Sequence, residues 1–345
     1  MTNRPSHVRP RPPDVIVVPT VRPGKRLRHA TGLAEALGCP LVALRSRQPP
    51  RSEPLVAGVG VPVFVLDIAP GATHGLPAFE TDALLRRTPF HVRTDLSLKR
   101  NLAFRLARQA GWSRVFFLDD DVTVPDVHDV RRAVGLLDRY AAAGLVIDGF
   151  PDGAVASHAT FALGASAGRS VAGGALAVTV ADPPSFFPTI YNEDLCYLLH
   201  EGGMRPSAVT GRALQEPYDP FRDPGRAGVE EFGETVVGGL HYIASHGYAP
   251  RDADAEYWRV FLNKRDRRLA EVRDQAASTM DGALKEAVYA ALSRAREMQA
   301  LITPALCVAY VAAWLRDRDT WGRYLRTLRE TTLEGALRHV DQVAC

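Results

Sequence analysis

The chain has 345 residues, of which 46% are hydrophobic and 23% are charged, and its formal net charge is +3. This composition is that of an ordinary folded globular protein and excludes bulk disorder. The basic residues are interspersed along the chain, whereas a nucleic-acid-binding protein more often gathers them on one stripe with aromatic residues between them. A nucleic-acid partner is therefore not expected.

The cysteine spacing bears on possible metal and redox sites. The amino terminus and the apolar runs bear on the cellular location of the protein. No two cysteines lie within CxxC spacing, so neither a zinc cluster nor a redox pair is indicated. Residues 1–13 are polar, lack the apolar core of a signal peptide and are expected to be flexible. The longest apolar run, 305–314, is shorter than the roughly 20 residues of a spanning helix. We therefore expect a cytoplasmic protein with reduced thiols and no transmembrane segment.

The first 150 residues alternate strands with helices. Apolar runs that end at turn residues predict strands at 14–20, 40–44, 61–66, 114–118 and 144–149. Helical spacing of apolar residues predicts helices at 24–37, 95–110 and 126–142. Residues 70–93 are expected to form a surface loop. This order predicts an α/β fold, with a mostly parallel sheet and helices on both faces.

Beyond residue 150 the pattern changes. Residues 151–181 are rich in Gly, Ala and Ser and are expected to contain two strands, the second at 174–180. The next expected elements are a turn at 182–188, a short helix to about 200, a strand at 207–210, a loop at 216–224 and a helix at 228–246. Helical periodicity then predicts four helices, at 253–275, 280–301, 304–316 and 319–340.

These elements predict three parts of the chain: a flexible start at 1–13, an α/β domain at 14–250 and a C-terminal helical domain at 251–345. The C-terminal helices are amphipathic and carry three of the four tryptophans. We therefore expect them to pack on the α/β domain or to form a homodimer contact.

Three consecutive carboxylates, Asp119, Asp120 and Asp121, follow the strand at 114–118. In an open α/β sheet, ligands bind beyond the carboxyl ends of the strands. Three adjacent carboxylates repel one another there unless a cation compensates them, and an oxygen-ligated divalent metal that bridges a nucleotide diphosphate supplies that charge. The alternative is an acidic turn that caps the next helix, although Pro125 and Asp126 can already begin that helix.

Two charged motifs are further candidates, each with an ordinary structural alternative. The run Asn192-Glu193-Asp194 can place a general base near an acceptor hydroxyl, or it can simply begin a helix. The run Lys-Arg-Asn at 99–101 can contact a diphosphate, or it can lie on a solvated helix face.

Two glycines and a histidine complete the candidates. Gly173 and Gly174 let a ligand approach the backbone closely, or they mark a bulge in the strand that follows. His241 is a candidate metal ligand, with His246 as its substitute, although a lone histidine is more often a packing or surface residue.

Taken in this order, the motifs resemble those of the GT-A glycosyltransferases, most of all the family 2-like members. The resemblance covers about residues 14–250, with matching motifs at 15–20, 99–101, 117–121, 173–174 and 192–194. It implies a Rossmann-like catalytic domain that moves a sugar from a nucleoside diphosphate sugar, of the UDP or GDP type, to an acceptor hydroxyl. It also implies Mg²⁺ or Mn²⁺ as the cofactor that stabilises the leaving diphosphate.

The resemblance also implies roles for single residues. Asp121 would coordinate the metal, Asp119 would share it or contact the ribose, and His241 matches a later histidine that serves some members as a third ligand. Asp194 matches the catalytic base of inverting members, and Glu193 would orient the acceptor. The implied nucleotide-sugar-binding positions are Pro19, Thr20, Asp67, Lys99, Arg100, Asn101, Asp119, Asp120, Gly173 and Gly174.

The sequence departs from the family where the strand at 40–44 leads into Arg45-Ser46-Arg47, in place of the usual acidic residue. The nucleotide base is therefore open, as are the sugar, the acceptor and the stereochemical outcome. Two other functions remain as alternatives. One is a nucleotidyltransferase acting on a sugar phosphate, although its Gly-rich basic loop is matched only loosely by Thr20 to Lys25. The other is a non-catalytic scaffold whose helical tail binds partners.

Overall fold

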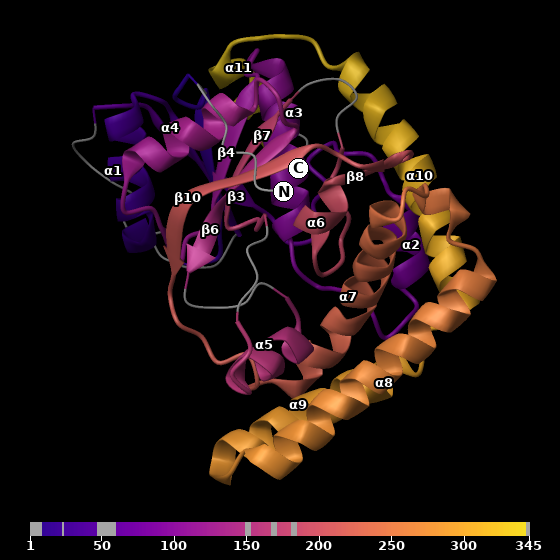
Figure 1. The fold of residues 1–345 in the computed structure, drawn as a ribbon. Coiled ribbons are helices and arrows are strands. Elements are labelled where there is room, and N and C mark those ends of the chain that lie inside the picture. The colour runs from indigo at the N-terminus through magenta and orange to yellow at the C-terminus, as the bar shows by residue number, and fades with distance from the viewer. Residues whose placement is uncertain are drawn as a thin grey trace.

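The computed structural model describes residues 9–22, 24–46, 60–148, 153–166, 171–180 and 185–342. An eight-stranded sheet in the order β3-β2-β1-β4-β7-β6-β10-β5 runs through the molecule (Figure 1). Its strands are β1 (Val15–Thr20), β2 (Leu41–Ser46), β3 (Val63–Ile68), β4 (Arg114–Leu118), β5 (Val122–Thr123), β6 (Ala142–Asp148), β7 (Ala175–Thr179) and β10 (Ser207–Gln215). A separate hairpin pairs β8 (Leu199–His200) with β9 (Gly203–Met204).

Most neighbouring strands of the large sheet are parallel, as the sequence predicts. The exceptions are β7, which is antiparallel to both β4 and β6, and β5, which is antiparallel to β10. Side chains that alternate along β1 pack on opposite faces: Val15 and Val17 join one hydrophobic cluster, and Ile16 and Val18 join the other. The sheet is therefore covered on both faces, which confirms the predicted α/β architecture.

Different helices cover the two faces of the sheet (Figure 1). The cluster that contains Ile16 includes residues of α1 (Arg28–Leu37) and α4 (Val127–Leu136). The cluster that contains Val15 includes residues of α3 (Leu96–Gln109), α6 (Glu193–Tyr197) and α7 (Pro224–Ser245). Two single turns of 3-10 helix, η1 (Gly24–Leu27) and η2 (Pro250–Asp252), precede α1 and the C-terminal helices.

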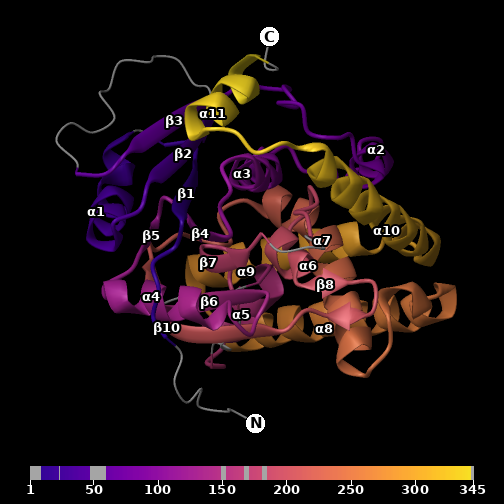
Figure 2. The same ribbon diagram turned by 90° about the horizontal axis from the view of Figure 1, so that it is seen from above.

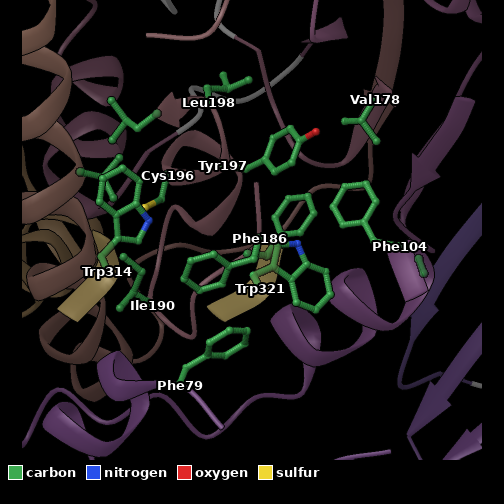
Figure 3. Close-up of a cluster of buried hydrophobic side chains, with 14 of the residues drawn as sticks. Phe79, Phe104, Val178, Phe186, Ile190, Cys196, Tyr197, Leu198, Trp314 and Trp321 are labelled. Carbon is green, nitrogen blue, oxygen red and sulfur yellow. The ribbon is translucent and has the colours of Figure 1, made fainter. Parts of the chain in front are cut away.

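The C-terminal helices are α8 (Ala255–Thr279), α9 (Gly282–Gln299), α10 (Pro304–Thr327) and α11 (Leu333–Gln342). They wrap around the α/β body, with α10 against α2 (Glu80–Leu85) and α11 against α3 (Figures 1 and 2). Trp314 and Trp321 of α10 are fully buried in the same cluster as the sheet residues, with Trp321 near the ring of Phe79 (Figure 3). Residues on both sides of position 250 therefore share one hydrophobic core.

No single helix in the described part of the chain is long and apolar enough to cross a membrane. The pair α9 and α10 meets the length and composition test only when taken together, and the two helices are bent by 80° at their junction.

Several stretches of the described chain differ from the sequence predictions. The expected loop at 70–93 contains helix α2, and the region expected to hold a first strand after residue 150 contains helix α5 (Val155–Ala162). The helix predicted to reach residue 142 ends at Leu136, since the strand β6 begins at Ala142, where it pairs with β7 and β10. The break expected after residue 316 is absent, because α10 continues to Thr327.

Tertiary contacts explain the two unexpected helices. The apolar face of α5, with Val155 and Ala159, packs in a cluster with Leu269 of α8 and Leu292 of α9. Helix α2 has no capping side chain of its own at its amino end, and Asp317 of α10 takes that role instead. Residues 1–8 of the segment expected to be flexible, and part of the turn expected at 182–188, lie outside the described residues.

The carboxylate of Asp317 generates the first prediction. Its Oδ1 accepts a hydrogen bond from the Glu80 amide at 2.7 Å, and its Oδ2 accepts from the amide and hydroxyl of Thr81 at 2.9 and 2.7 Å. Asp317→Asn replaces one acceptor oxygen with a donor, so urea unfolding should show a loss of about 2 kcal/mol, within the range for hydrogen bonds to charged groups. Asp319→Asn, on an exposed position of the same helix, is the control and should be nearly neutral. Equal stability of the two variants would contradict the capping role.

Candidate functional site

The candidate site lies at the carboxyl end of β4, where the path of the chain through the sheet changes direction. The chain moves from β1 outward to β2 and β3 and then returns to the other side of β1 as β4. Because β1 and β4 are parallel, Thr20 and Asp119 follow the strands at the same edge. β7 is antiparallel to β4, so Gly173 and Gly174, which precede it, lie at that edge too. Such a topological switch point is where open α/β sheets bind ligands.

The second and third carboxylates of the triplet face the end of β1. Asp120 accepts hydrogen bonds from the Thr20 hydroxyl at 2.5 Å and from Arg22 at 2.6 Å. Asp121 lies 3.4 Å from the same guanidinium, and its side chain is only 20% exposed. Arg22 is a site residue that the sequence analysis missed. It follows β1 by two positions, but nothing local shows that its partners lie about a hundred residues away.

The first carboxylate, Asp119, belongs to a buried ion cluster centred on Arg100. The Arg100 guanidinium donates to Glu193 at 2.6 Å and to Asp119 at 3.3 Å, and it stacks near the rings of Phe117 and Phe187. Burial raises the pKa of both carboxyl groups, whereas the charge of Arg100 acts to lower it. The guanidinium thus fixes both groups in place.

Asp194 is held by the backbone on both of its oxygens. Its Oδ2 accepts from the Gly173 amide at 2.6 Å, and its Oδ1 accepts from the Leu195 amide at 2.8 Å. A Cβ at position 173 would lie 2.5 Å from Arg100 Nη1 and 2.8 Å from Asp194 Oδ2. Glycine is therefore required there because two charged side chains of the protein itself approach the backbone.

The site contains more acidic side chains than basic side chains that pair with them. Five carboxylates gather here, namely those of Asp119, Asp120, Asp121, Glu193 and Asp194. The ion pairs that they form within the described chain involve only two cations, Arg22 and Arg100. Such an excess in a partly buried place favours binding of a cation.

The donor set was tested for its fit to a divalent metal. The described residues contain no group of three or more His, Cys, Asp or Glu side chains that could hold a metal ion by themselves. Mg²⁺ is commonly held by one or two carboxylates together with water and substrate phosphates, and Asp119 and Asp121 offer that kind of oxygen donor. The site therefore fits a metal that arrives with a phosphate ligand.

The structure does not bring His241 into this cluster. His241 lies on α7, and its Nε2 is 2.9 Å from the carbonyl oxygen of Leu195, which can only accept a hydrogen bond. Burial lowers the pKa of His241. Because a carbonyl oxygen only accepts, Nε2 carries the donated hydrogen. The contact supports the end of α6, so Nε2 is not free for a metal and the geometry does not favour the expected role as a third ligand. His246, the substitute, bonds within its own helix at the exposed end of α7.

Two expected nucleotide-binding side chains, those of Lys99 and Asn101, form contacts within the protein instead. The Lys99 ammonium is buried, and its three hydrogens are matched by the Thr20 carbonyl at 2.9 Å, Ser46 at 2.6 Å and Asp95 at 2.8 Å. The Asn101 amide exchanges two 2.8 Å hydrogen bonds with the backbone of Phe187. Lys99 and Asn101 therefore join α3 to the sheet and to the segment before α6, and a direct contact with a diphosphate is not what their geometry favours.

The remaining expected positions lie at the same edge of the sheet. Pro19 and Thr20 end β1, where they pair with Leu44 and Arg45 of β2. Asp67 is the second-last residue of β3 and forms a 2.7 Å ion pair with Arg45 of β2. An acidic side chain therefore lies next to the arginine at the end of the second strand.

A cavity of about 1020 Å³ opens over Asp119, Gly173 and Gly174. It is lined by residues of the segment 86–97, by Tyr218 and by the first turns of α7. Glu193 and Asp194 also line the cavity. The volume is large enough for a small molecule, and convergent charged groups at one end are typical of a ligand site.

No family model matches the sequence, and no curated protein sequence matches it. Among solved structures, a similar chain is the mannosyltransferase PcManGT from Pyrobaculum calidifontis, which was solved in complex with GDP-Man and Mn²⁺. The two chains are 16% identical, the alignment covers 91% of each, and the TM-score is 0.42. A likeness of this degree does not establish the chemistry of the present chain, which has to be inferred from its own residues.

Because Arg100 and Asp194 lie close to the backbone at Gly173, a side chain at this position is expected to destabilise the fold. Gly173→Ala should lower the free energy of unfolding by about 1–3 kcal/mol, the usual cost of overpacking, because Arg100 and Asp194 are both held by other bonds and cannot move aside freely. Gly32→Ala is a matched control on an exposed turn of α1, where an added Cβ meets no atom within 4 Å. It should stabilise by up to about 1 kcal/mol through helix propensity. Chemical denaturation measures both, and an equal effect of the two substitutions would contradict the assigned packing.

Proposed function

We propose that this chain is a metal-dependent glycosyltransferase of the GT-A type. It transfers a sugar from a nucleoside diphosphate sugar, of the UDP or GDP type, to the hydroxyl of an acceptor. The observation that carries the proposal is the surplus of carboxylates beside a ligand-sized cavity at the switch point of the sheet. A diphosphate with a divalent metal suits such a place, because the metal offsets both the protein carboxylates and the phosphates.

The donor side of the proposed site consists of the ends of β1, β2, β3 and β4. Asp119 and Asp121 would hold Mg²⁺ or Mn²⁺, which when bound neutralises the diphosphate as it leaves. Asp120 accepts hydrogen bonds from Thr20 and Arg22, one on each carboxylate oxygen. It would therefore orient the turn after β4 rather than bind the metal. Lys99 keeps the strand ends in register and thereby shapes the nucleotide pocket.

The acceptor side of the proposed site is the cavity lined by the segment 86–97 and α7. Asp194 also lines this cavity, and its two oxygens are oriented by the amides of Gly173 and Leu195. In an inverting reaction Asp194 would accept the proton of the attacking hydroxyl. Glu193, bonded to Arg100, would orient the acceptor beside it.

The donor site is tested by nucleotide binding. We expect UDP- or GDP-sugars to raise the melting temperature only with Mn²⁺ or Mg²⁺, and a ligand at 100 times its dissociation constant adds about 2.7 kcal/mol of stability. Asp121→Asn should abolish this metal-dependent binding and leave the fold intact, as measured by calorimetry and circular dichroism. Asp138→Asn is the control, because Asp138 pairs with Arg114 at the opposite end of β4.

Two outcomes would overturn this assignment. Unchanged metal-dependent affinity in Asp121→Asn would reduce the triplet to a turn that caps a helix. Release of pyrophosphate from a nucleoside triphosphate and a sugar phosphate, in place of nucleoside diphosphate release from a nucleotide sugar, would identify a nucleotidyltransferase.

The role of Asp194 is tested by Asp194→Asn, which keeps the size but cannot take up a proton. Sugar transfer or donor hydrolysis should fall by about 10²–10⁴-fold, the usual contribution of a positioned base, while donor affinity is retained. The substitution also costs one of the two backbone hydrogen bonds, so a modest fall in melting temperature is expected. Asp254→Asn is the matched control, since Asp254 likewise accepts from a backbone amide, at 2.8 Å, but caps α8. Full turnover in Asp194→Asn, or retention of the anomeric configuration by NMR, would remove Asp194 from this role.

A further inference from the structure

The backbone turns sharply directly before the two carboxylates on the acceptor side. Asn192 adopts the left-handed conformation, with φ 60° and ψ 35°, and α6 begins at the next residue. Asn is one of the few residues that enters this region at low cost, although it still needs support from its surroundings. Because Glu193 and Asp194 directly follow Asn192 in the sequence, the backbone conformation of Asn192 determines the directions in which their side chains project.

The side chain of Asn192 is held from α7. Its Nδ2 donates a 2.8 Å hydrogen bond to Oε2 of Glu234. The backbone before it is also seated on this helix, since a Cβ at Gly233 would lie 2.2 Å from the carbonyl oxygen of Tyr191. Helix α7 therefore contacts this segment in two ways: its backbone at Gly233 packs against Tyr191, and its Glu234 accepts a hydrogen bond from Asn192.

Glu234 is in turn held from the C-terminal helix α8. Arg265 of α8 lies 3.7 Å from Oε1 of Glu234 and forms a two-bond pair, at 2.7 and 2.9 Å, with the fully buried Glu231. Buried ion pairs contribute little net stability, because the desolvation of their charges offsets most of the attraction. What they do provide is a fixed geometry, since a charged pair tolerates few alternative arrangements in a buried place.

We infer that Asn192, Glu234 and Arg265 form a positioning clamp that aims Glu193 and Asp194 at the reacting groups. The clamp extends from the C-terminal helices, which contribute no residue to the cavity wall, to the acceptor side of the site. None of the three residues is assigned to the chemistry. The inference rests on the proposed function for its effect on turnover, but its effect on the conformation of residues 192–197 stands independently.

The test uses Glu234→Gln in the full chain. Gln has the size of Glu but only one oxygen, so it cannot present acceptors to both Asn192 and Arg265. Amide hydrogen exchange at residues 195–198 of the free protein should become faster, with no change in β4. Transfer or donor hydrolysis should fall by about 10- to 100-fold with unchanged donor affinity, because small misplacements of catalytic groups have effects of that size.

Asp266→Asn is the matched control. Asp266 is the neighbour of Arg265 and also joins two helices, by a 2.7 Å pair with Arg296 of α9, but it does not point to Glu234. A second pair of variants tests the backbone conformation: Asn192→Gly keeps the left-handed turn accessible, whereas Asn192→Ala does not. The Gly variant should therefore retain more turnover and slower exchange than the Ala variant.

The outcomes distinguish the positioning clamp from the proposed function. Wild-type exchange and turnover in Glu234→Gln, or an equal effect of Asp266→Asn, would overturn the clamp. Faster exchange in Glu234→Gln alone, in a protein that binds no nucleotide with any metal, would support the clamp and disprove the proposed function. Equal behaviour of Asn192→Gly and Asn192→Ala would show that the left-handed turn does not matter.

Discussion

The guanidinium of Arg100, buried to 2% exposure, joins three segments that the chain reaches at distant points: helix α3, the end of β4 and the start of α6. Removing one partner of a buried pair typically costs about 3–5 kcal/mol, because the remaining charge has no compensation. Arg100 therefore holds the carboxylates of Asp119 and Glu193 in one rigid frame. The glycine at 173 is the consequence, since no larger residue fits between this guanidinium and Asp194.

One guanidinium cannot balance the charge of the site, and this imbalance is the physical basis of the proposed function. Arg22 compensates Asp120 and approaches Asp121, but the carboxylates still outnumber the cations. If the end of β4 were only a structural turn, the folded protein would be more stable with fewer carboxylates there. Keeping them partly buried beside a cavity is costly unless a bound cation restores the balance. The C-terminal helices contact this region through Arg265 of α8, which lies 3.7 Å from Glu234 of α7, and Glu234 in turn accepts a hydrogen bond from Asn192.

Local patterns in the sequence were sufficient to predict the parallel strands, the helices between them and the place of the carboxylate triplet. Each follows from apolar periodicity or from the position of a polar residue after a strand. Helix α2 could not be predicted this way, because its amino end is capped by Asp317 from more than 200 residues further on. Arg22 was missed for the same reason. The role of Lys99 and the contact of His241 were also unpredictable, since a charged or titratable side chain does not reveal whether its partner is a ligand or a neighbouring strand or helix.

The central claim is that the site binds a divalent metal jointly with a nucleoside diphosphate. Electron paramagnetic resonance of Mn²⁺ tests this directly, because free Mn²⁺ gives a sharp spectrum that is lost on binding. Titration of the protein with Mn²⁺ alone should leave most of the ion free, since the described residues offer too few ligands by themselves. With Mn²⁺ and protein at equal concentrations, addition of UDP, GDP or the corresponding nucleotide sugars should convert the spectrum to the bound form. The loss of the free signal should be larger than the loss that the same nucleotide causes without protein. A spectrum that the protein leaves unchanged with every nucleotide would contradict the claim.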